Sequence, residues 1–118
     1  MPVVYLAETP AGALLEVCVH TAANDIPPSY TLLEVSVPAR TSIERVDPKA
    51  LSRDWPENLE VTRAVGSEWL RSTRSALLRI PSVIVPATYN VLINPSHLDS
   101  KQIQVKSSIE YPFDVRLK

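Results

Sequence analysis

The sequence has little cysteine, little glycine and almost no net charge. Cys18 is its one cysteine, which excludes an intrachain disulfide, and the apolar neighbours of Cys18 predict a buried thiol in a reducing compartment. Two glycines stand beside eleven prolines, so a glycine-rich phosphate-binding loop is excluded. A net charge of −1 over 118 residues provides no basic field, which makes nucleic acid a poor candidate for a direct partner.

Long hydrophobic runs are also missing. No apolar run approaches the roughly 20 residues that span a bilayer, so we expect no membrane partner. The first residues, MPVVYLAETP, lack the positive charges of a secretory signal peptide. These absences predict a cytoplasmic protein. With 45% hydrophobic and 21% charged residues, the chain is ordinary for one globular domain, and we expect that domain to span residues 1–118.

The residue patterns predict a mixed α and β domain, of the α+β class, with at least five short strands and two main helices. Thr9-Pro10 provides a helix N-cap and a first-turn proline, so a helix is expected from about Pro10 to about His20. A second helix is expected where apolar residues recur at helical spacing, over 61–72. Strands are expected at 3–6, 30–37 and 42–46, within 76–86 and 89–95, and after 103.

The first helix contains one carboxylate, Glu16, within the stretch GALLEVCVH. This helix is apolar nearly all round, which predicts burial on most of its sides. In one interpretation Glu16 faces solvent and pairs with His20, four residues further along. In the other, the carboxylate lies at the rim of the helix, where its charge is poorly screened and available for chemistry.

The remaining polar residues do not form a recognisable catalytic motif by themselves. Ser82 follows a proline between strand residues, where a serine is most often a strand-end hydroxyl, and Asn90 has the character of a turn former. His20 and His97 stand apart without zinc-site spacing, so no metal is expected. No GxSxG motif supports a Ser-His-Asp triad.

Four segments resemble, in order, the RES domain family: VVYLAETPAGALLEVCVH, SRDWP, GSEWLRSTRSALLRIPSVIVPATYNVLINPSH and PFDVRL. RES domains are toxins of bacterial toxin–antitoxin pairs that resemble ADP-ribosyltransferases in fold and consume NAD+ by hydrolysis, phosphorolysis or ADP-ribosyl transfer to a protein. The resemblance implies this fold for residues 1–118, with NAD+ as substrate, no cofactor, and a helix-turn-helix antitoxin as protein partner.

The resemblance also implies roles for individual residues. The family's glutamate falls on Glu16 and its serine on Ser82, which makes these two the expected catalytic residues. Ser82 is expected to hydrogen-bond ribose or phosphate and not to act as a nucleophile. Tyr5 matches an aromatic position near the nicotinamide pocket, and Asn90 is an expected substrate-binding residue.

The family's arginine lies upstream of the segment that matches Val3, in a glycine-rich stretch similar to GGRW, and this sequence begins after it. Arg40, Arg74 and Arg79 could substitute, but they do not lie in that motif. We therefore expect the 118-residue form to bind NAD+ weakly or not at all. An exposed sheet edge beside Val3 is also expected, and such an edge favours a homo-oligomer or a complex.

Two alternatives remain open from the sequence. The chain could be a catalytically inactive relative that keeps the RES fold as a protein-binding module. It could also be an unrelated small structural domain, which would require the match over residues 66–97 to be chance.

Overall fold

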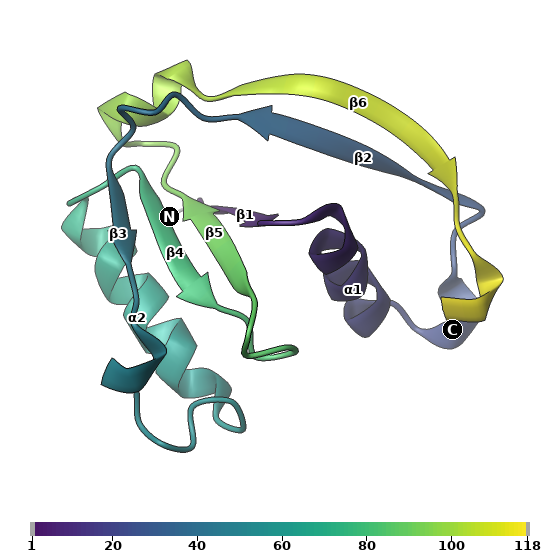
Figure 1. The fold of residues 1–118 in the computed structure, drawn as a ribbon, viewed down its shortest axis with the longest axis horizontal. Coiled ribbons are helices and arrows are strands. Elements are labelled where there is room, and N and C mark those ends of the chain that lie inside the picture. Colours follow the sequence, from purple (N-terminus) through teal and green to yellow (C-terminus); the bar gives the residue numbers. More distant parts are fainter. Residues whose placement is uncertain (1, 118) are drawn as a thin grey trace.

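The computed structural model describes residues 2–117, which form two α-helices and six β-strands (Figure 1). The chain is of the α+β class, as the sequence predicts. Neither helix has the length and apolar character of a bilayer-spanning segment. In chain order the elements are β1 (Val4–Ala7), α1 (Pro10–His20), β2 (Ser29–Ser36), β3 (Ile43–Arg45), α2 (Leu59–Ser72), β4 (Leu77–Pro81), β5 (Tyr89–Ile93) and β6 (Gln104–Pro112).

Four strands form one sheet in the order β1-β5-β4-β3. β4 and β5 form an antiparallel hairpin, β1 pairs antiparallel with β5, and β3 pairs parallel with β4. β1 is therefore an edge strand, and Val4 and Tyr5 on it are 45% and 71% exposed. The exposed edge that the sequence predicts beside Val3 is present.

The local sequence fixes both ends of α1. The Thr9 hydroxyl accepts a hydrogen bond from the Gly12 amide at 3.0 Å, and Pro10 occupies the first helical position. At the other end, the Thr21 hydroxyl donates to the Val17 carbonyl at 2.7 Å. The helix has the predicted bounds because these caps are local features.

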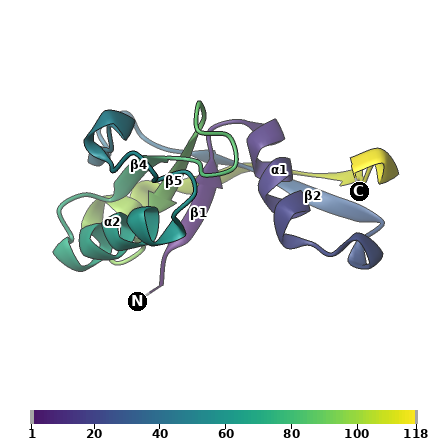
Figure 2. The ribbon, with the colours of Figure 1, turned by 90° about the horizontal axis from the view of Figure 1, so that it is seen from below.

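The expected burial of α1 is wrong. Cys18 is its one buried residue, at 8% exposure, whereas Leu15, Val17 and Val19 are 39%, 43% and 53% exposed. The reason is the position of the helix beyond the edge of the sheet, beside β1, where no second layer formed by residues 2–117 covers it (Figures 1 and 2). The apolar helix thus packs mainly against β1 and contacts the β4–β5 hairpin through Glu16, with much of its surface exposed.

α2 covers one face of the sheet through a core around Trp69. The indole is fully buried against Leu78, Ile80 and Leu92, and its Nε1 donates to the Ser75 hydroxyl at 2.8 Å. A second cluster, around Leu77 and Ile93, lies on the other face because successive strand residues alternate. These two clusters hold the sheet on which the candidate site is built.

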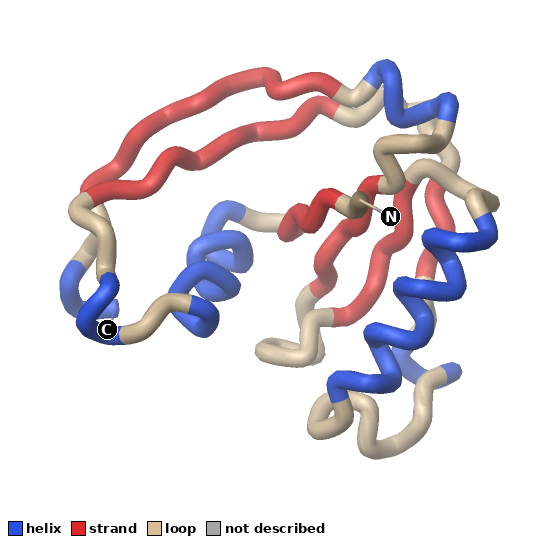
Figure 3. The backbone as a smooth tube through the Cα atoms, turned by 180° about the vertical axis from the view of Figure 1, so that it is seen from behind, coloured by secondary structure: helices blue, strands red, loops and turns tan. Residues whose placement is uncertain are grey.

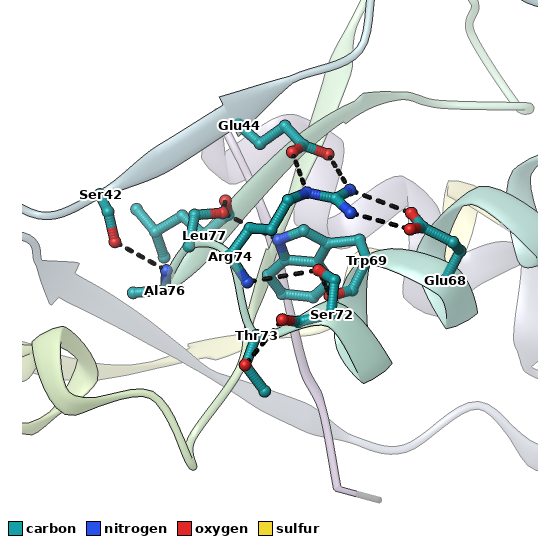
Figure 4. Close-up of polar contacts among 10 residues, drawn as sticks. Ser42, Glu44, Glu68, Trp69, Ser72, Thr73, Arg74, Ala76 and Leu77 are labelled. Carbon is teal, nitrogen blue, oxygen red and sulfur yellow. Dashed lines mark hydrogen bonds and ion pairs between the residues drawn. The ribbon is translucent and has the colours of Figure 1, made fainter.

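Arg74 ties α2 to β3 just after the helix ends (Figure 4). Thr73 adopts a left-handed conformation, with φ at 54°, and turns the chain toward β4. The Arg74 guanidinium then donates to both oxygens of Glu44 at 2.9 and 3.0 Å, and to both oxygens of Glu68 at 2.8 and 3.0 Å. These contacts raise the pKa of Arg74 further above its usual range, with Glu68 the larger cause.

β2 and β6 form a separate two-stranded sheet, a long ribbon that extends from the four-stranded sheet toward the chain segment after α1 (Figures 1 and 3). Apolar side chains on this ribbon are exposed to solvent, with Leu33, Val105 and Ile109 between 47% and 58% exposed.

The molecule has 7910 Å² of accessible surface, whereas a compact monomer of this mass has about 6,400 Å². Its radius of gyration is 15.2 Å, against about 13.5 Å for a compact domain.

Candidate active site

A cleft of about 870 Å³ lies between α1 and α2, and the sheet forms its floor. Figure 2 shows the two helices on either side of β1. Polar side chains from four elements line this cleft: Tyr5 on β1, Glu16 and His20 on α1, Asn90 on β5, and Thr62, Arg63 and Ser67 on α2.

Side chains from the hairpin and from α1 hold the Glu16 carboxylate in place. One oxygen, Oε1, accepts a hydrogen bond from Asn90 Nδ2 at 3.1 Å and a longer one from Ser82 Oγ at 3.5 Å. The other, Oε2, lies 3.7 Å from His20 Nε2, and the Glu16 side chain is 31% exposed. The carboxylate therefore faces His20, as the first interpretation expects, and Asn90 on β5 holds it as well.

Ser82 is buried where β4 leads into the hairpin turn. Its hydroxyl accepts hydrogen bonds from the backbone amides of Ile84 at 3.2 Å and Val85 at 3.5 Å. It faces a smaller cavity of about 110 Å³, which Glu16 and Asn90 also line, and it does not line the larger cleft. The structure therefore gives Ser82 a turn-stabilising role in addition to its contact with Glu16.

Tyr5 lies on the sheet floor of the larger cleft, and its ring is open to a ligand because the residue is 71% exposed. Glu16 and Asn90 line both cavities, so the carboxylate can be approached from two sides. Within residues 2–117, no three histidine, cysteine, aspartate or glutamate side chains lie close enough together to hold a metal ion.

The three arginines considered from the sequence do not line the larger cleft. Arg40 lies in the turn between β2 and β3, and Arg74 is held by two glutamates. Arg79 pairs with Glu8 at 2.5 Å and stacks on the ring of Tyr89, 3.5 Å from its centroid. The Glu8 carboxylate raises the pKa of Arg79.

Arg63 lines the cleft, and no motif in the sequence points to it. The helical pattern of α2 draws attention to the stripe that packs on the sheet, which includes Val65 and Trp69. Arg63, Gly66 and Ser67 occupy a second stripe at the same spacing, and this stripe faces the cleft. The small residues Gly66 and Ser67 in this stripe are the sequence feature that could have indicated a second, uncovered face of the helix.

Comparison with known proteins decides the family. The RES domain family matches residues 1–114 of the chain. The chain belongs to the RES domain family. It is 38% identical over 119 aligned residues to a Prs ADP-ribosylating toxin of Sphingobium sp. strain YBL2, an alignment that covers 98% of this chain and 74% of the relative.

Other RES proteins give the same result. A protein named Toxin Res from Pseudomonas putida KT2440 is 38% identical over 109 residues, with 89% of this chain and 74% of that protein covered. A Toxin Res from Photorhabdus laumondii is 34% identical over 119 residues, with 98% and 76% covered. These names support a toxin role for this RES domain.

Proposed function

We propose that this RES domain cleaves the bond between nicotinamide and ribose in NAD+, and that loss of NAD+ is the basis of its toxic action. The observation that carries the proposal is the Glu16 carboxylate, which Asn90 holds at 3.1 Å beside an 870 Å³ cleft. The family match and the toxin names of the relatives add independent support.

A fixed negative charge at the reacting carbon favours this reaction. As the bond from ribose C1′ to the nicotinamide nitrogen breaks, both bonding electrons leave with neutral nicotinamide and positive charge develops on the ribose. Sugar cleavage of this type passes through an oxocarbenium-like transition state. A carboxylate held beside C1′ stabilises that charge most when it needs no reorganisation, and the hydrogen bond from Asn90 supplies this preorganisation.

The nucleophile completes the reaction at C1′. With water, a new C–O bond forms, a proton is released and the product is ADP-ribose. Phosphate in the same place gives a phosphorylated ADP-ribose, and a protein side chain gives ADP-ribosylated protein. The smaller cavity supports access for a nucleophile of modest size because Glu16 lines it as well as the larger cleft.

Partner binding forms the second part of the proposal. A helix-turn-helix antitoxin is the proposed partner in the cell, with the chain acting in the cytoplasm. Exposed apolar residues on α1 and on the ribbon of β2 and β6 support a protein partner. The same surfaces favour the second candidate function, a RES domain that binds protein without catalysis.

Nicotinamide release separates the two candidate functions. The purified chain is incubated with millimolar NAD+, because weak binding is expected, and nicotinamide is quantified by chromatography with and without phosphate. Nicotinamide that appears with ADP-ribose indicates hydrolysis, and a phosphate-dependent product indicates phosphorolysis. NAD+ that remains intact under all conditions, with acceptor protein included, would refute catalysis and favour the binding module.

A further inference from the structure

The two walls of the larger cleft carry opposite charge. Glu16 lies on the α1 wall and Arg63 on the α2 wall, and among the described residues they are the two charged side chains of the cleft when histidine is counted as neutral. NAD+ has the matching polarity, since its nicotinamide ring is cationic and its diphosphate is anionic. A ligand with its ribose at Glu16 therefore has an electrostatic reason to direct its diphosphate toward α2.

Arg63 is available for a ligand because its own ion pair is weak. Its Nη1 lies 3.6 Å from Glu60, three residues earlier, and the two side chains are 69% and 82% exposed. Exposed ion pairs of this kind contribute little to stability. Arg79, by contrast, is engaged by a short ion pair with Glu8 and by stacking on the ring of Tyr89.

The surroundings of Arg63 leave room for a phosphate group. Gly66, one turn further along α2, has no side chain, and its nearest non-local neighbour is Leu92 on the floor of the cleft. The exposed Ser67 hydroxyl follows on the same wall. This stripe therefore presents a guanidinium and a hydroxyl donor to the 870 Å³ cleft, and a guanidinium binds two phosphate oxygens in a planar fork.

We infer that Arg63 binds the diphosphate of the substrate dinucleotide and orients it across the cleft toward Glu16. The identity of the dinucleotide rests on the proposed function, whereas the phosphate-binding role of Arg63 is tested on its own. Arg63 is a binding residue in this inference and takes no part in bond cleavage.

Titration calorimetry with ADP tests the inference without catalysis. The wild-type chain should bind ADP, Arg63→Ala should bind it about tenfold to a hundredfold more weakly, and Arg63→Lys should lie between them. Arg71→Ala is the matched control, because it removes the same charge from an exposed position of α2 that does not line the cleft. Wild-type chain that fails to bind ADP, or an Arg63→Ala variant that binds it equally well, would overturn the inference.

Nicotinamide riboside, which has no phosphate, provides the second arm. If both substrates are cleaved, Arg63→Ala should raise the KM for NAD+ and leave cleavage of nicotinamide riboside unchanged. An equal loss with both substrates would contradict the inference, since it would indicate a general structural effect. ADP binding that depends on Arg63, in a chain that cleaves no NAD+, would refute the proposed function and leave the inference standing.

Discussion

At the scale of single residues, the candidate site depends on how Glu16 is held. Its two oxygens face different partners, Asn90 and Ser82 on one side and His20 on the other. The sequence identifies Glu16 because it is one carboxylate within an apolar helix. It does not show that Asn90 contacts Glu16, because this contact joins residues 74 positions apart and depends on the pairing of β1 with β5.

Asn90 is predicted to position Glu16, a role different from the substrate binding that the family resemblance implies. Asn90→Ala removes the 3.1 Å hydrogen bond. A hydrogen bond to a charged group is worth about 1.5–3 kcal/mol, so kcat for nicotinamide release should fall about tenfold to a hundredfold while KM changes little. Steady-state kinetics measures both. A raised KM with normal kcat would assign Asn90 to substrate binding instead.

Asn90→Asp gives an independent readout of the same contact. It places a second carboxylate beside Glu16, and two carboxylates that share a site raise the pKa of one of them. The acid limb of the pH–rate profile should therefore move to higher pH in this variant. An unchanged profile would show that residue 90 does not act through Glu16.

Ser82 is predicted to stabilise the hairpin turn. Ser82→Ala removes the acceptor for the amides of Ile84 and Val85, and the free energy of unfolding should fall by about 1 kcal/mol. Urea denaturation measures this loss, and Ser108→Ala, at an exposed position of β6, serves as the control. The rate of NAD+ turnover should also fall in Ser82→Ala. A covalent adduct trapped on Ser82 would contradict its assignment as a hydrogen-bonding residue.

At the scale of elements, α1 depends unusually strongly on its own caps. It lies against β1 with several apolar side chains exposed. Tertiary packing therefore contributes less to the stability of α1 than to that of α2. Thr9→Ala should lower the free energy of unfolding by about 1 kcal/mol, and the first-turn amides of α1 should exchange hydrogen faster. Thr9→Ser keeps the capping hydroxyl and should behave like the wild type. Equal exchange in all three proteins would show that α1 is held in another way.

The elements also show what sequence patterns can and cannot specify. Thr9-Pro10 and the strand-rich runs within residues 76–86 and 89–95 are local signals, and the elements that they predict are present. The exposure of α1 could not be predicted in this way, because it depends on which elements lie beside it. Arg63 was missed for a similar reason, since an exposed arginine on a helix gains significance only when α1 forms the opposite wall of the cleft.

At the scale of the whole molecule, the excess surface predicts association. The accessible surface exceeds that of a compact monomer by about 1,500 Å², and a stable interface buries about 800 Å² on each partner. We expect sedimentation equilibrium to give a mass above the 13.1 kDa of one chain. Leu33→Lys, on the exposed ribbon, should weaken association if that surface takes part. A monomer at tens of micromolar would contradict association of the chain with itself.

We propose that the Glu16 charge promotes cleavage of NAD+, and Glu16→Gln tests this role most directly because the side chain keeps its size and loses its charge. The measurement is nicotinamide release at millimolar NAD+, with Glu57→Gln as the control at an exposed position outside both cavities. We predict that kcat falls by about a hundredfold or more in Glu16→Gln, with an unchanged unfolding transition, and that Glu57→Gln matches the wild type. Undiminished release of nicotinamide by Glu16→Gln would contradict this role of Glu16.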